Sequence, residues 1–310
     1  MGDQAENLRE LMRKKNETGT VKGEKQAEKT AANSELTPLK KKSGKKTRII
    51  TIASGKGGVG KTNISVNLAI AYAQLGKKVI VLDADLGLAN VNVMMNMIPK
   101  YNLYHVIRKQ KKMSEIILDT NYGIKMVAGA SGFSKIANLE EAERNSFIDE
   151  LSTLSDADII IIDTSAGVSQ NVLSFVAAAD DAIIITTPEP TAITDAYGII
   201  KIIATEIDNF DIGLKLIVNR VKTSAQGKAV ADKMTNISAQ FLNLKVEYLG
   251  FIYDDPLVPQ SVLKQKPFIT VDPKGKPSIC IRHIVGRMEK TEIPDSGGLQ
   301  GFIKKLFKKT

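Results

Sequence analysis

Cysteine and histidine are scarce in this chain of 310 residues, which has one cysteine, Cys280, and two histidines, His105 and His283. A single cysteine excludes an intramolecular disulfide and a cluster held by several cysteines. The two histidines have no partners at the spacing of metal ligands, so we interpret them, like Cys280, as structural. The sequence thus gives no sign of a cysteine- or histidine-ligated centre.

Long hydrophobic runs and a leader are also missing. No apolar stretch approaches the ~20 residues that a transmembrane helix needs, and the polar N-terminus is unlike a secretory signal peptide. We expect a cytoplasmic protein that is soluble at rest. The 43% of hydrophobic and 25% of charged residues suit one ordinary α/β domain with appendages.

The formal net charge of +9 is concentrated near the two ends of the chain. One lysine-rich run occupies residues 40–46, and four lysines lie near the C-terminus: Lys304, Lys305, Lys308 and Lys309. Such runs are usually solvated, but they also favour anionic surfaces of lipid or nucleic acid. Residues 14–46 are polar and free of aromatic residues, which predicts a flexible basic linker.

A glycine-rich segment, residues 54–62, lies between a β-branched run at 48–53 and an apolar run of helical spacing at 63–75. This order predicts a phosphate-binding loop, because glycines let backbone N–H groups approach phosphate oxygens and a helix N-terminus attracts the anion. We expect Lys61 to contact the β- and γ-phosphates and the Thr62 hydroxyl to bind Mg²⁺. The nucleotide would also be surrounded by Gly55, Lys56, Gly57, Gly58, Val59, Gly60 and Asn63.

Strand-like apolar runs alternate with helical stretches along residues 47–292. We predict strands at 79–82, 124–128, 159–163, 182–186, 214–218 and 248–252, and helices at 139–154, 169–179, 193–207 and 229–242. The alternation predicts an α/β fold with a mostly parallel central sheet covered by helices on both faces. Ligands should gather at the carboxyl ends of the strands.

Three aspartates stand at the ends of predicted strands. Asp163 ends a run of four isoleucines and precedes small residues that suit a mobile loop, while Asp83 and Asp85 follow the run at 79–82. An acid at this edge of the sheet can hold Mg²⁺ through water. Carboxylates near the metal and the γ-phosphate can also position water for attack, since phosphoryl transfer asks mainly for positioning. The residues alone do not rank Asp83 against Asp85.

The C-terminal segment, residues 293–310, begins with a turn-forming stretch and continues with amphipathic helical spacing. One face carries five apolar residues, and the lysines take the other: Leu299, Phe302, Ile303, Leu306 and Phe307. This pattern is typical of an interfacial membrane helix, and the glycine pair and the lysines argue against burial. The alternative is a helix docked on its own domain. One copy should bind a membrane weakly, and two copies in a dimer more tightly.

Residues 1–13 have the pattern of a short capped helix. Asp3 can cap it, with Glu6 as the return half of a capping box, and Ala5 and Leu8 share a face. A dozen residues are too few for a stable helix in water, so the segment either frays or folds against a partner.

The loop that contains Lys56, Lys61 and Thr62 resembles the deviant P-loop of the MinD/ParA ATPases. The resemblance implies ATP or ADP and Mg²⁺ as ligands. It also implies a homodimer in the ATP state, in which Lys56 reaches the partner's nucleotide and contributes to catalysis with Lys61. Asn63 stands where the family often has a second threonine.

The same resemblance assigns the acids and the base site. Asp85 would orient the hydrolytic water and Asp83 would support the metal, as in the family's switch I, while residues 163–167 are similar to switch II, with Asp163 at the metal. Asn219 and Arg220 resemble an element whose asparagine reads adenine. Two further segments follow strands and can close the base pocket or form plain turns: 188–191, and 254–256 with Asp254.

The start of the chain resembles the D-Q-A-x-x-L-R motif of the flagellar number regulators FlhG, also called YlxH or FleN, a branch of this family. The motif residues are Asp3, Gln4, Ala5, Leu8 and Arg9. The resemblance implies that residues 1–13 stimulate FlhF, a signal-recognition-particle-type GTPase, and that the ATPase domain meets cytoplasmic-ring proteins of the flagellar motor. It also implies an anionic membrane as the partner of residues 293–310, on the inner face of the cell membrane.

Two other functions stay open. A cell-division-site regulator of MinD type would share the mechanism but leaves residues 1–13 without a role. A ParA-type DNA-partition ATPase would bind DNA through its basic surface with strong salt dependence. The apolar stripe at 299–307 has no use on DNA, so DNA is not an expected partner. A non-hydrolysing scaffold is disfavoured by the intact phosphate loop and acids.

Overall fold

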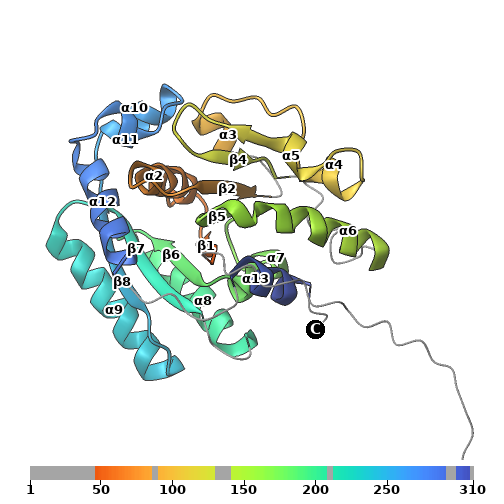
Figure 1. Ribbon diagram of the computed structural model, residues 1–310. Coiled ribbons are helices and arrows are strands. Elements are labelled where there is room, and N and C mark those ends of the chain that lie inside the picture. Colours follow the sequence, from red (N-terminus) through yellow and green to blue (C-terminus); the bar gives the residue numbers. More distant parts are fainter. Residues whose placement is uncertain (1–45, 86–89, 130–140, 208–211, 291–297, 308–310) are drawn as a thin grey trace, which may run out of the picture. The chain divides into compact units, whose positions relative to one another are not determined.

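A computed structural model describes residues 46–85, 90–129, 141–207, 212–290 and 298–307 (Figure 1). The predicted FlhF-activating motif at 1–13 and nearly all of the linker at 14–46 lie outside the described residues. Lys308 and Lys309 do so too. The fold below is that of the remaining unit, which includes all of the residues predicted for the nucleotide site.

Eight strands form one sheet in the order β3-β4-β2-β5-β1-β6-β7-β8. Every neighbouring pair is parallel except β3–β4, at one edge. The strands are β1 (Arg48–Ala53), β2 (Val79–Ala84), β3 (Ile117–Asp119), β4 (Lys125–Val127), β5 (Ile159–Thr164), β6 (Asp181–Thr186), β7 (Gly213–Val221) and β8 (Glu247–Tyr253). The predicted mostly parallel sheet is confirmed, and the antiparallel edge strand is an addition.

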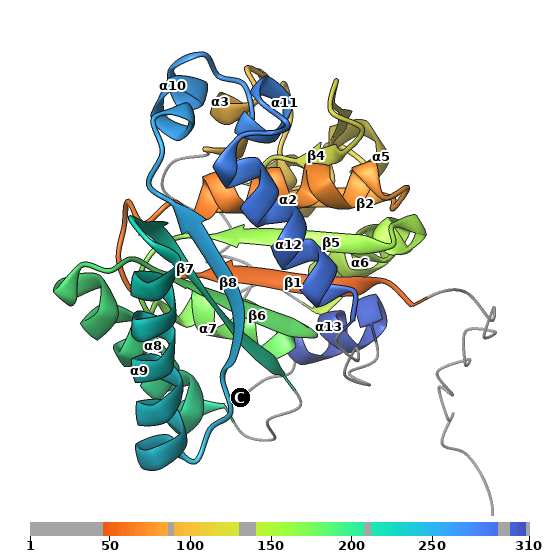
Figure 2. The same cartoon turned by 90° about the vertical axis from the view of Figure 1, so that its left-hand side faces the viewer.

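Helices cover both faces of the sheet because successive side chains of a buried strand point to opposite sides. In β1, Ile50 and Ile52 face one layer and Ile49 and Ala53 face the other. The first layer has α2 (Lys61–Gln74), α3 (Val91–Met94), α10 (Leu257–Leu263), α11 (Phe268–Val271) and α12 (Lys276–Met288). The second has α4 (Leu103–Ile107), α5 (Met113–Ile116), α6 (Glu141–Ser152), α7 (Gln170–Ala178), α8 (Pro190–Glu206), α9 (Ser224–Leu242) and α13 (Gly298–Leu306). Figure 2 shows α2 and α12 side by side over the sheet.

The long elements that were predicted match their ranges to within five residues, but the 13-residue helix α12 and the short elements were given no predicted range. Helix α8 begins at Pro190 rather than at residue 193, because proline is well suited to the first turn of a helix. Helices α3, α4, α5, α10 and α11 have between four and seven residues. Segments this short do not establish a helical period in the sequence.

Helix α13 is docked on the domain, which corrects the expectation that its glycines and lysines argue against burial. Leu299, Phe302 and Ile303 are 6%, 6% and 4% exposed, within the core shared with α6 and α7. The rings of Phe307 and Phe147 pack edge to face, with their centroids 6.1 Å apart. Figure 1 shows α13 beside α7. Docking leaves Lys304 exposed and Lys305 half-buried, so neither lysine is fully buried. Within the described ranges, no helix is long and apolar enough to cross a membrane.

Candidate nucleotide site

The glycine-rich loop connects the end of β1 to the start of α2, at the carboxyl edge of the sheet. Gly60, the residue before α2, has φ 98°, and a Cβ there would lie 2.4 Å from Asn219 Nδ2. A side chain at Gly60 is therefore excluded by both conformation and contact. The loop is thus built for close approach of backbone to a ligand, as the sequence predicts.

Lys61, the first residue of α2, is 8% exposed and lies inside the loop. Its Nζ donates a hydrogen bond to Ser54 Oγ at 2.9 Å. Burial lowers the pKa of Lys61, and the nearby charges of Asp163 and Asp85 oppose that shift. A bound phosphate would oppose it further, so the site favours an anion beside this ammonium.

Thr62 and Asp163 are brought together as expected for a magnesium site. Thr62 Oγ1 donates to Asp163 Oδ2 at 2.7 Å, and Ser65 Oγ donates to Oδ1 of the same carboxylate at 2.8 Å. Ser65 was not among the predicted site residues; its place one turn after Thr62 was the available signal. Across the described part of the chain, no group of three or more histidine, cysteine or acidic residues could hold a metal. One hydroxyl and one carboxylate suit Mg²⁺, which keeps several waters and takes phosphate oxygens.

Asp83 lies beside Asp163, since the two residues are paired in register between β2 and β5. Its Oδ1 accepts a hydrogen bond from the Asp85 N–H at 3.1 Å, and its Oδ2 accepts from Asn90 at 3.0 Å and Val91 at 3.2 Å. This carboxylate therefore ties the backbone of Asp85, Asn90 and Val91 to the end of β2. Its predicted support of the metal stays a prediction.

Burial controls the protonation of both buried acids. It raises the pKa of Asp83 to about 7, with the negative charge of Asp163 as the next cause. Burial also raises the pKa of Asp163 to about 6, against the hydrogen bonds from Thr62 and Ser65 and the charge of Lys61. Two carboxylates on neighbouring strands, paired in register, favour a cation between or beside them.

A pH dependence of stability follows for the nucleotide-free protein. Folding raises the pKa of Asp83 from 3.8 to about 7. The contribution of Asp83 to the free energy of unfolding is therefore fully present below the pKa of the unfolded state and is lost as pH rises through the pKa of the folded state. We expect the free energy of unfolding, measured by urea titration, to fall by a few kcal/mol relative to Asp83→Asn between about pH 4 and pH 7. A wild-type-minus-variant difference that stays constant with pH would contradict this.

Asp85 follows β2 directly and is half-buried. Its charge acts on both Lys61 and Asp163, so it lies close to the phosphate end of the site. This position suits the predicted role of orienting water.

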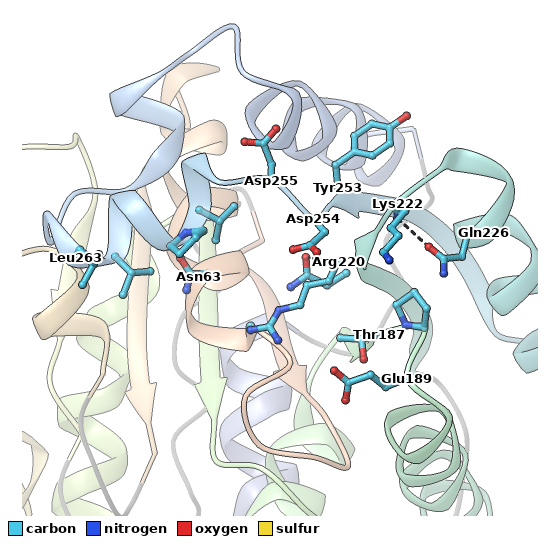
Figure 3. A pocket seen from close by; sticks show the side chains of 16 residues that line it. Asn63, Thr187, Glu189, Arg220, Lys222, Gln226, Tyr253, Asp254, Asp255 and Leu263 are labelled. Carbon is cyan, nitrogen blue, oxygen red and sulfur yellow. Dashed lines mark hydrogen bonds between the residues drawn. The ribbon is translucent and has the colours of Figure 1, made fainter.

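A pocket of about 840 Å³ opens beside the loop and is lined by Gly60, Asn63, Thr187, Pro188, Glu189, Asn219, Arg220, Lys222, Gln226, Tyr253, Asp254, Asp255, Val258, Pro259, Val262 and Leu263. Figure 3 shows Arg220 in the middle of this group, between Asn63 and Thr187. Both candidate closing segments contribute residues, at 188–189 and 254–255. The pocket therefore brings Asn219, Arg220 and Asp254 together with part of each candidate closing segment, and their contact with a base stays a prediction.

Asn219 has a second task that the sequence did not indicate. Its Nδ2 donates to the Val59 carbonyl at 2.7 Å, and its Oδ1 accepts from the Arg220 N–H at 2.9 Å. Asn219 therefore braces the glycine-rich loop. An amide has a second N–H and a second lone pair, so contact with adenine is compatible with this bracing and stays a prediction.

Lys56 is held within its own chain. Its Nζ donates to Thr191 Oγ1 at 2.8 Å and pairs with Glu189 Oε2 at 3.1 Å, both near the start of α8. The side chains of Lys56 and Glu189 are 38% and 56% exposed. Reaching a partner's nucleotide requires Lys56 to leave these two residues.

Comparison with known proteins identifies the family to which this chain belongs. The family model of the CobQ/CobB/MinD/ParA nucleotide binding domain matches residues 50–268. The chain belongs to this family. It is 35% identical to the antiactivator FleN of Pseudomonas aeruginosa over 84% of the chain and 93% of that protein. It is 37% identical to the flagellum site-determining protein YlxH of Helicobacter pylori over 84% of the chain and 90% of that protein.

A solved MinD/ParA-type structure agrees with the fold. The septum site-determining protein MinD of Pyrococcus horikoshii, complexed with Mg-ADP, matches with a TM-score of 0.62 and 25% identity over 79% of the chain and 96% of that structure. As a MinD/ParA-type protein, the chain is a P-loop ATPase. The sequence resemblance to this family is confirmed.

Proposed function

We propose that the protein is an ATP-switched regulator of flagellar number and placement, which dimerises with ATP, associates with the membrane and stimulates FlhF. The main support is its similarity to FleN and YlxH over 84% of the chain. A complete phosphate loop with Lys56, Lys61 and the acids lies inside the matched region. Cytoplasmic-ring proteins of the motor are the further partners that this proposal includes.

The chain's own residues divide the chemistry of hydrolysis. Lys61 and the loop N–H groups would bind the phosphates, and Thr62 and Asp163 would hold Mg²⁺, which neutralises developing phosphate charge when bound. Asp85 would orient the attacking water. Lys56 would add positive charge from the partner subunit, so turnover depends on dimerisation.

Dimerisation through Lys56 has a direct test. We expect Lys56→Ala to remain monomeric in gel filtration with Mg²⁺ and a non-hydrolysable ATP analogue, whereas wild type dimerises. Glu189→Gln should dimerise at least as well as wild type, because an exposed ion pair stabilises its geometry by only about 0–1 kcal/mol and releasing it is easy. A dimer of Lys56→Ala as stable as that of wild type would contradict the role of this lysine.

Membrane association has to be reconciled with the docked state of α13. Leu299, Phe302 and Ile303 cannot meet lipid while they pack against α6 and α7. We therefore include in the proposal that α13 leaves this site when the protein binds a membrane. Lys304 and Lys305, on the other face, would then lie near anionic headgroups.

The FlhF GTPase rate tests the flagellar assignment. We expect the full-length protein to stimulate a cognate FlhF, and Gln4→Ala or Arg9→Ala to remove the stimulation. Gln26→Ala, in the linker, is the matched control and should stimulate normally. An active FlhF that responds to none of the proteins would contradict this part of the proposal and favour a division-site role.

A further inference from the structure

A basic and aromatic surface around α4 has no part in the nucleotide site. We call it the α4 patch, and it consists of Ile98, Lys100, Tyr101, Tyr104, Arg108, Lys109, Lys111 and Lys112. It contains five cationic side chains, whereas Glu115 is the one acid among residues 90–116. The buried side of α4, with Leu103, Val106 and Ile107, fixes this surface to the core.

Ring and cation contacts hold the patch in a defined shape. Lys111 Nζ lies 4.5 Å from the centroid of the Tyr101 ring, and the Arg108 guanidinium lies 5.3 Å from that of Tyr104. Arg108 Nε also donates to Tyr104 Oη at 3.0 Å. His105 binds Asn102 at 2.9 Å, which supports its predicted structural role at the helix start. These contacts hold Arg108 and Lys111 against the two tyrosine rings.

Ile98 adds a strongly exposed apolar side chain to this surface. It is 94% exposed, two residues before Lys100, and Tyr101 is 36% exposed. Two acids of adjacent elements have partners of their own: Glu150 of α6 accepts a hydrogen bond at 2.6 Å from the N–H of Met113, the residue after Lys112, and Asp119 of β3 pairs with Lys125 at 3.7 Å. Glu150 therefore offsets part of the charge at the Lys112 end of the patch. Glu115 is bound to Lys111 at 2.8 Å. The remaining positive charge faces solvent around an exposed isoleucine.

The α4 patch lies in the same layer as α13. Both α4 and α13 pack against α6, and their apolar residues belong to one core cluster (Figure 1). The α4 part of the patch and the amphipathic helix thus lie on the same face of the sheet, and Ile98 follows Met97, which packs in the other layer. An anionic surface that receives α13 would approach the part of this layer around α6, whereas α9 packs on α8 and belongs to a separate core cluster.

We propose that the α4 patch is a second membrane contact, in which Lys100, Lys109 and Lys112 meet anionic lipid headgroups and Ile98 enters the apolar boundary. The inference rests on the proposed membrane association. Lipid fits better than nucleic acid because an aliphatic side chain forms no hydrogen bond or ion pair with phosphates or base edges. Isoleucine and tyrosine both suit the membrane interface. An acidic protein segment would explain the lysines but leaves Ile98 exposed.

Vesicle sedimentation of the full-length protein with Mg²⁺ and ATP tests the patch. The vesicles contain phosphatidylglycerol, and vesicles of phosphatidylcholine alone give the uncharged reference. Each of the single variants Lys100→Gln, Lys109→Gln and Lys112→Gln should bind these vesicles about fivefold more weakly than wild type. Ile98→Ser should weaken it about tenfold. Lys111 is kept because it holds Tyr101 and Glu115.

Matched controls come from α9 and the residues after it. Phe241 is 67% exposed, and Lys228, Lys233 and Lys245 are exposed; Phe241→Ser and the triple glutamine variant of these lysines should bind vesicles as wild type does. Solution ATPase activity without vesicles should be unchanged in every variant, which shows that the fold is intact.

The outcomes separate this inference from the proposed function. If wild type binds anionic vesicles and the patch variants bind equally well, the patch is not a lipid contact and a protein or nucleic-acid partner is the better assignment. If wild type itself does not bind with ATP, the proposed membrane association fails together with this inference. Selective loss in the patch variants, with normal binding of the controls, supports the second contact.

Discussion

Replacing Asp85 by alanine is expected to slow ATP hydrolysis roughly 100-fold or more while leaving ATP binding intact. A carboxylate that positions the attacking water acts mainly in the transition state, and losing such a group typically costs about 10²–10⁴ in rate. Asp85 follows β2, and its charge reaches Lys61 and Asp163. The residues predicted to contact the phosphates, Lys61 and the glycine-rich loop, are kept in this variant.

In this variant the rate of ATP hydrolysis should fall and the lifetime of the ATP-bound dimer should rise. With ATP and Mg²⁺, the Asp85→Ala dimer should persist in gel filtration after the wild-type dimer has decayed. Asp149→Ala, at an exposed position on α6, is the matched control and should hydrolyse ATP at the wild-type rate. A normal rate of ATP hydrolysis in Asp85→Ala would contradict the assignment of Asp85 as the residue that orients water and would favour Asp83 in that role.

The double variant Leu306→Ser with Phe307→Ser is expected to bind anionic vesicles at least about 100-fold more weakly in the presence of ATP. Each large apolar side chain contributes roughly 1.5–3 kcal/mol when fully buried, so two of them account for such a loss. Both residues are half-buried in the docked state, and the fold should tolerate the change. Truncating Phe302 would instead cost about 3–5 kcal/mol of stability.

Thiol labelling follows the release of α13 itself. Cys280 is buried, so a cysteine introduced by Ile303→Cys gives the main reactive thiol. We expect slow labelling of the nucleotide-free protein and at least tenfold faster labelling with ATP and vesicles. Equal rates, together with normal vesicle binding, would show that α13 stays docked and that the membrane contact lies elsewhere.

Local patterns explain what the sequence predicted well. The four isoleucines before Asp163 form the buried centre of β5, and the glycine-rich segment is recognisable because a strand precedes it and a helix follows. The order of these elements brings the acids to one edge of a parallel sheet. The fold class and the residues of the phosphate site therefore follow from short stretches of chain.

Long-range contacts explain what was missed. Lys56 meets Glu189 and Thr191 across more than 130 residues, and no local pattern indicates that pairing. Asp181 likewise joins Arg48 at 2.6 Å and Lys215 at 3.5 Å in a buried network of charges. Such pairs depend on the order of strands in the sheet.

The docking of α13 is a related case. An amphipathic stripe has the same pattern whether it packs on protein or lies on lipid, so the sequence could not choose between them. The apolar residues of α6 and α7 that α13 packs against, such as Phe147 and Phe175, are distant from it in the chain.

The number of flagella per cell, counted by electron microscopy in the source organism, tests the central claim most directly. We expect cells that carry Lys61→Ala in place of the native gene to show an altered number or placement of flagella, with division sites unchanged. Gln26→Ala cells should match wild type. Normal flagella together with misplaced division septa would contradict the account and assign the protein to the division site.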